Sequence, residues 1–133
     1  MAILVLDDFS NSEIKKAVEL NTDYIADGIV IFYWRELASK YDVPNENLPA
    51  EPSEIVKLYL TNEVSIRVAS DRIGSNLEEI IEGVTTDVWE QKKNAFISDR
   101  DRYLGMISAS DIYDPENPPE TPGDSSTTRL NFG

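Results

Sequence analysis

Residues 52–73, PSEIVKLYLTNEVSIRVASDRI, form the stretch of the chain that decides its fold. Apolar side chains recur along it at steps of three and four residues, which is the period of a buried helix. Pro52 and Glu54 suit the start of this helix, because proline is tolerated in the first turn and an acid complements the helix dipole there. Gly74 stops it. The many β-branched residues would allow a strand, but the length of the stretch favours a helix.

Two apolar stripes run along this predicted helix. The first consists of Ile55, Tyr59, Ile66, Ala69 and Ile73, and the second of Val56, Leu60, Val64 and Val68. A helix that is apolar on more than one side is usually central. We therefore expect helix 53–73 to lie in the middle of the fold.

Two further helices are predicted on the N-terminal side. Ser10 or Asn11 can cap a short helix that has Glu13 in its first turn. Asp23 precedes a longer helix over 24–41, and the residues expected to form its buried face are Ile25, Ile29, Phe32, Tyr33, Leu37 and Tyr41. Gly28 weakens that helix by about 1 kcal/mol relative to alanine.

The last long helix is predicted over 87–107, with Thr85 or Thr86 as its cap. Leu77–Ile81 is long enough for one helical turn before it. Three aromatic residues of the long helix recur at seven-residue steps, and Ile107 extends the series: Trp89, Phe96 and Tyr103. Such a stripe is more often part of a core than a ligand site. The expected fold is therefore mainly α, a small helical bundle over residues 1–110.

The composition changes at residue 111. The segment 111–133 is acidic, rich in proline and poor in apolar residues, so it cannot form a core of its own. We interpret it as an extended C-terminal arm, with a frayed terminus as the alternative. Polar and apolar side chains alternate in its last residues, a pattern that suits addition to the edge of a β-sheet. These residues are the candidate partner-binding residues: Arg129, Leu130, Asn131 and Phe132.

Catalytic chemistry has little support in this sequence. The chain has no cysteine and no histidine, which excludes disulfides and thiolate chemistry and removes the commonest acid–base residue. Acidic pairs such as Asp7-Asp8 and Glu78-Glu79 are expected by chance among 25 acids. Residues 99–105 fail the calcium-loop pattern, and Asp99 and Arg102 fit an ion pair on a helix better. We predict no enzyme activity, no cofactor and no metal.

The formal charge of the chain is −13, from 25 acidic and 12 basic residues. A field of this sign repels nucleic acid and anionic membranes. It fits plain solubility, a basic protein partner, a DNA mimic, or a surface past which DNA slides. No apolar run approaches the ~20 residues of a membrane span. The apolar start lacks the basic residues of a secretory signal, so we expect a protein that is cytosolic or is assembled inside a cell.

Four parts of the chain follow one another in an order that is typical of one protein family. They are the segments 52–60 (PSEIVKLYL) and 87–96 (DVWEQKKNAF), the pair Tyr103-Leu104 and the C-terminal arm. This order resembles the small head–tail connector, or adaptor, proteins of tailed bacteriophages. The resemblance implies two long antiparallel helices and an arm that docks against the portal. It also implies a ring, commonly of twelve copies, that joins the portal to tail proteins in the virion. DNA would pass through the ring without specific binding, and the acidity would help it slide.

The main alternative is a small acidic inhibitor that mimics DNA and binds a basic nucleic-acid-binding protein. Such a mimic requires carboxylates in a dense stripe, whereas acids here concentrate in the connections and the tail, which favours the adaptor. An enzyme subunit or a toxin–antitoxin partner is a third possibility that no specific feature supports.

Overall fold

A computed structural model describes residues 3–74, 86–116 and 118. All regular elements in these residues are helical, as the sequence predicts. The α-helices are α1 (Ser12–Leu20), α2 (Asp27–Lys40), α3 (Glu54–Gly74), α5 (Thr86–Met106) and α6 (Ala109–Ile112). Three 3-10 turns accompany them, η1 (Leu6–Asp8), η2 (Thr22–Ile25) and η3 (Asn45–Asn47).

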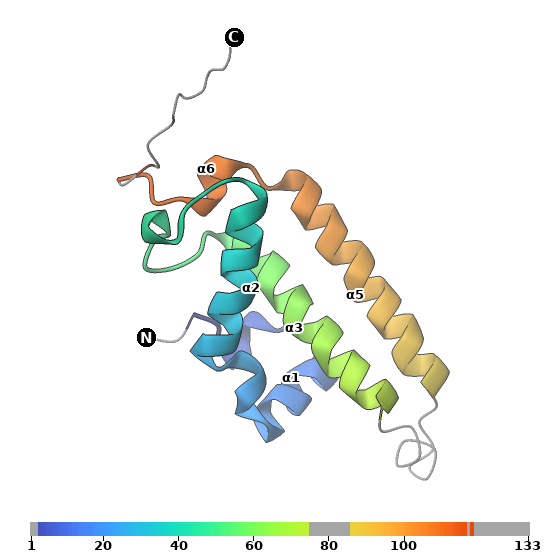
Figure 1. Cartoon of the computed structure of the whole chain (residues 1–133). Coiled ribbons are helices and arrows are strands. Elements are labelled where there is room, and N and C mark those ends of the chain that lie inside the picture. The colour runs from blue at the N-terminus through green and yellow to red at the C-terminus, as the bar shows by residue number, and fades with distance from the viewer. Residues whose placement is uncertain (1–2, 75–85, 117, 119–133) are drawn as a thin grey trace.

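Helix α3 is the centre of the fold. It runs between α1 and α2 on one side and α5 on the other, and α5 is antiparallel to it (Figure 1). The predicted second stripe is fully buried, with at most 1% of any side chain exposed: Val56, Leu60, Val64 and Val68. Tyr59 and Ala69 of the first stripe are buried as well. The central position expected from two apolar stripes is therefore confirmed.

Helix α5 follows the prediction for 87–107 to within one residue at each end. Trp89 and Ile107 are buried, and Phe96 and Tyr103 are partly buried against the core. The aromatic stripe is thus part of the core. The predicted cap at Thr85 and the predicted turn at Leu77–Ile81 lie outside the described residues.

Helix α1 begins as the sequence suggests, and its cap is Asn11. The side-chain oxygen of Asn11 accepts hydrogen bonds from the backbone N–H groups of Glu13 and Ile14, at 3.0 Å each. These two donors have no partner within the helix, so the cap satisfies them.

The region predicted as one helix over 24–41 is divided. Thr22–Ile25 forms the 3-10 turn η2, and α2 begins only at Asp27. Asn21 accepts from the backbone N–H of Asp23 and so caps η2, and the chain turns at Ala26 before α2 starts. Local side-chain capping therefore shortens the helix that the periodicity predicts.

The prediction for this helix was wrong at Ile29 and Phe32 and right at Leu37. Ile25, Tyr33 and Tyr41 are partly buried against the core. The buried side chains are Val30, Trp34, Leu37 and Ala38, whereas Ile29 is 40% and Phe32 58% exposed. Because α2 carries large apolar residues around its whole circumference, periodicity selects no face. The position of α3 selects it.

Residues just after the predicted boundary at 110 contact the helical bundle. Ile112 in α6 is fully buried. The hydroxyl of Ser53 donates to the carbonyl of Asp111 at 2.9 Å, and the N–H of Asp114 donates to the carbonyl of Asn47 at 2.8 Å. These contacts hold the segment from α6 to Asp114 against the start of α3 and against η3.

Candidate functional site

Two hollows flank the line along which α5 packs on α3. Helix α3 is the main neighbour of α5 among the described elements. Polar contacts link α5 to the other helices: the Tyr41 hydroxyl donates to the carbonyl of Leu104 at 3.0 Å, and Lys92 pairs with Glu13 at 2.6 Å. The two hollows lie on either side of the contact between α3 and α5.

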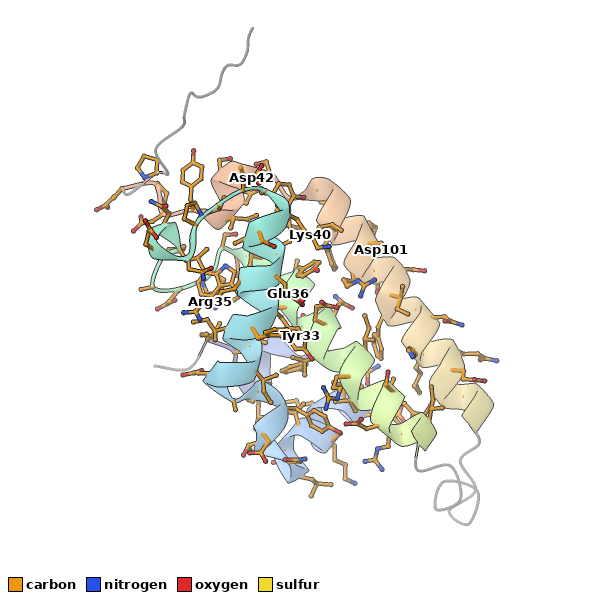
Figure 2. All side chains as sticks on the ribbon, in the orientation of Figure 1. Tyr33, Arg35, Glu36, Lys40, Asp42 and Asp101 are labelled. Atoms are coloured by element: carbon orange, nitrogen blue, oxygen red, sulfur yellow. The ribbon has the colours of Figure 1, made fainter. Side chains whose placement is uncertain are left out.

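The first hollow, which we call the charged groove, lies between α2, α3 and α5 and has a volume of about 280 Å³. Glu36 and Lys40 of α2 line it from one side and Asp101 of α5 from the other (Figure 2). Its remaining charged residues are Glu63 and Arg100. Three acids and two bases thus meet in a small space.

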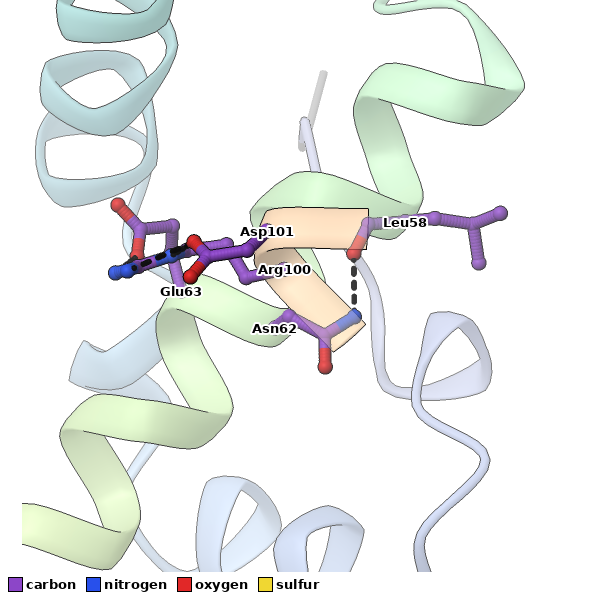
Figure 3. Close-up of polar contacts among 5 residues, drawn as sticks. All are labelled: Leu58, Asn62, Glu63, Arg100 and Asp101. Carbon is purple, nitrogen blue, oxygen red and sulfur yellow. Dashed lines mark hydrogen bonds and ion pairs between the residues drawn. The ribbon is translucent and has the colours of Figure 1, made fainter. Parts of the chain in front are cut away.

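Arg100 connects the two long helices at the base of this groove. Its guanidinium lies 3.0 Å from the carboxylate of Glu63 on α3 and 3.1 Å from that of Asp101 (Figure 3). Partial burial disfavours the charge of Arg100, but its hydrogen bonds and attraction to Glu63 and Asp101 outweigh burial and raise its pKa. We interpret the Glu63–Arg100 pair as a clasp between α3 and α5.

Tyr59 beside this clasp is poorly suited to acid–base chemistry. Burial, and then the nearby Glu63 carboxylate, raise the pKa of Tyr59 to about 12. Its hydroxyl therefore stays protonated at neutral pH. The charged groove consequently has the character of a structural contact, since its acids and bases largely neutralise one another.

The second hollow, which we call the Phe96 groove, has a volume of about 300 Å³ and lies between the segment around η1, α3 and α5. Phe9 is buried in it, Phe96 and Tyr103 are partly buried, and Leu58 is 41% exposed. The groove therefore offers apolar and aromatic surface to whatever enters it.

The polar residues of the Phe96 groove are largely occupied by their own helix. The hydroxyl of Thr61 donates to the carbonyl of Leu58 at 3.0 Å, and that of Ser65 to the carbonyl of Thr61 at 2.7 Å. The amide of Asn62 also donates to the carbonyl of Leu58, at 2.8 Å (Figure 3). Because these donors are used, an apolar group can lie against this part of the groove without leaving them unsatisfied.

A smaller hollow of about 130 Å³ lies where η2 and the start of α2 meet the end of α3. The Tyr24 hydroxyl donates to Asp71 at 2.6 Å, and Arg67 pairs with Asp71 at 3.5 Å. Burial and the Asp71 carboxylate raise the pKa of Tyr24 to about 12. Ile29 on its edge continues into exposed Phe32, so an apolar ridge borders this hollow.

The acidic residues considered from the sequence have structural partners. Asp7 pairs with Lys15 at 3.2 Å, and Asp8 accepts from the N–H of Val5 at 2.8 Å. The predicted pair of Asp99 with Arg102 is confirmed, at 3.3 Å. Among the described residues, no group of three or more acids is arranged to hold a metal ion.

Neither the sequence-predicted partner-binding residues nor the Glu78-Glu79 pair can be placed. Arg129, Leu130, Asn131 and Phe132 lie outside the described residues, as do Glu78 and Glu79. Sequence reasoning missed the Glu63–Arg100 clasp, whose partners are 37 positions apart. The only hint was that residues 53–73 and 88–107 each contain bases among their acids.

None of the described helices is long and apolar enough to cross a membrane. Comparisons of the chain with protein-family models, with curated proteins and with solved structures found no match.

Proposed function

We propose that this protein is a structural subunit of a phage virion, which forms a homo-oligomeric ring between the portal and the tail and extends the DNA channel. The antiparallel pair α3 and α5, each of 21 residues, carries the proposal. It agrees with the layout that the adaptor resemblance implies. Because α5 packs mainly on α3, its remaining surface is available to a neighbouring copy.

Apolar side chains are exposed on two different parts of the domain. Phe32 on α2 is 58% exposed, and Met106 at the end of α5 is 62% exposed. A closed ring is built from heterologous contacts, in which one face of each copy meets a different face of the next. The α2 ridge of Ile29 and Phe32 and the outer surface of α5 supply two such faces.

The charge of the chain suits a channel wall. A net charge of −13 per copy, repeated around a ring, repels the phosphates of a passing duplex and prevents it from sticking. The ring would therefore guide DNA without reading it.

The proposal is tested by measuring native mass with light scattering, for the protein alone and mixed with the portal ring encoded in the same genome. We expect a mass of about twelve times 15.0 kDa, alone or bound to the portal, and rings in electron micrographs. Replacing Phe32 with serine should weaken assembly, whereas replacing Leu20, which is 74% exposed on α1, should not.

A protein that stays monomeric under both conditions contradicts the proposal. If such a monomer displaces DNA from a basic nuclease or repressor, the DNA-mimic alternative takes its place.

A further inference from the structure

We infer that the end of the chain, residues 129–132, docks into the Phe96 groove of a neighbouring copy. This inference rests on the proposed self-assembly and names one contact that holds the copies together. Its grounds are the surface of the groove, the charge at its edge and the length of chain beyond the described residues.

The groove leaves apolar surface in contact with water. Leu58 is 41% exposed at its edge, while Phe96 and Tyr103 are only partly covered by the core. Transfer of such surface from water is favourable, at about 25 cal/mol per Å². Since the hydroxyls of Thr61 and Ser65 already donate to α3 carbonyls, an apolar side chain can enter without leaving them unsatisfied.

The negative charge at the groove favours a segment of the chain that carries a basic residue. The charged residues that line it are both acidic, Asp8 and Asp99. The segment after residue 108 carries five acids, which these carboxylates repel, and Arg129 is its only base. In an extended segment Leu130 and Phe132 project to one side and Arg129 to the other. Two apolar side chains can therefore enter the groove while the guanidinium meets the acids at its edge.

The alternating polar and apolar residues of the tail suggested docking on the edge of a β-sheet. We infer that a groove between helices takes that role. The part of the chain that the structure describes contains no strand, so it offers a neighbouring copy no sheet edge. Leu130 is twelve positions after Pro118, and an extended chain of that length spans about 40 Å. The chain after Pro118 is therefore long enough to extend about 40 Å from its own domain.

Disulfide trapping tests the inference cleanly, because the chain has no cysteine of its own. Copies carrying Leu58→Cys are mixed with size-tagged copies carrying Gly133→Cys, and cross-linked heterodimers are followed on non-reducing gels. Val88→Cys is the matched control, since Val88 and Leu58 are both helical and 41% exposed. We expect the Leu58→Cys mixture to cross-link about ten times faster than the control mixture, because docking raises the local concentration of the thiols. Adding Phe132→Ser to the tagged copy should remove this difference.

Native mass measured on the same samples separates the possible failures. If the protein assembles but both mixtures cross-link at the same rate, the inference is overturned while the proposed function stands. If nothing assembles, the proposed function fails and the inference fails with it. A cross-link that forms only within one chain carrying both cysteines places the tail on its own domain and also overturns the inference.

Discussion

Replacing Trp89 with alanine should destabilise the domain by about 3–5 kcal/mol. The Trp89 side chain is only 5% exposed, and an aromatic residue in such a position buries about 150–250 Å². At about 25 cal/mol per Å² this burial contributes about 4–6 kcal/mol, which residual compactness of the unfolded chain reduces to about 3–5. Arg72 and Lys92 stand 5.9 and 5.8 Å from the ring centre, and their attraction to the ring adds to the loss.

The measurement is urea unfolding followed by circular dichroism, with the free energy extrapolated to water. Val88→Ala is the neighbouring control, because Val88 is 41% exposed and its truncation should cost less than about 1 kcal/mol. If Trp89→Ala fails to fold, Trp89→Phe keeps part of the packing and should lose about 1–2 kcal/mol. A loss below about 0.5 kcal/mol for Trp89→Ala would show that the ring is not buried and would refute the role given to the aromatic stripe.

Four further outcomes are expected. Glu63→Gln should cost about 1–3 kcal/mol in urea unfolding, because it removes the negative charge that lies 3.0 Å from the partly buried Arg100, and an unchanged stability would contradict the clasp. Gly28→Ala should stabilise α2 by about 0.5–1 kcal/mol, since a Cβ there meets nothing within 4 Å, and a lower melting temperature would contradict this reading. The pKa values of Tyr24 and Tyr59 are raised from 10.0 to about 12, so folding stability should fall as pH rises through that window, and Tyr59→Phe should make the fall shallower in pH titrations of unfolding. Chelator treatment should leave the melting temperature unchanged, and a large drop would reveal a carboxylate metal site.

The two long helices could be predicted from the sequence because their signals are local. Helix α3 begins two residues after Pro52 and ends at Gly74, and both effects act through the backbone of the residue itself. Asn11 capped α1 for the same reason, since its side chain reaches backbone N–H groups only two and three positions away. The two stripes make α3 apolar on more than one side, so its central place also followed from its own residues.

Other features depended on residues far apart in the chain, and no local signal encodes them. Periodicity could not predict the buried face of α2, because Phe32 and Trp34 are both large apolar residues. In the packed structure Trp34 is buried and Phe32 is exposed. The Glu63–Arg100 clasp requires α3 and α5 to align in one register, and the sequence alone cannot show which of its many acids and bases meet across that register. The packing of α6 depended on residues far earlier in the chain, because Ile112 is fully buried and Ser53, 58 positions before Asp111, donates to its carbonyl. Helix ends are therefore set by neighbouring backbone, whereas faces, pairs and grooves are set by the packing of one helix on another.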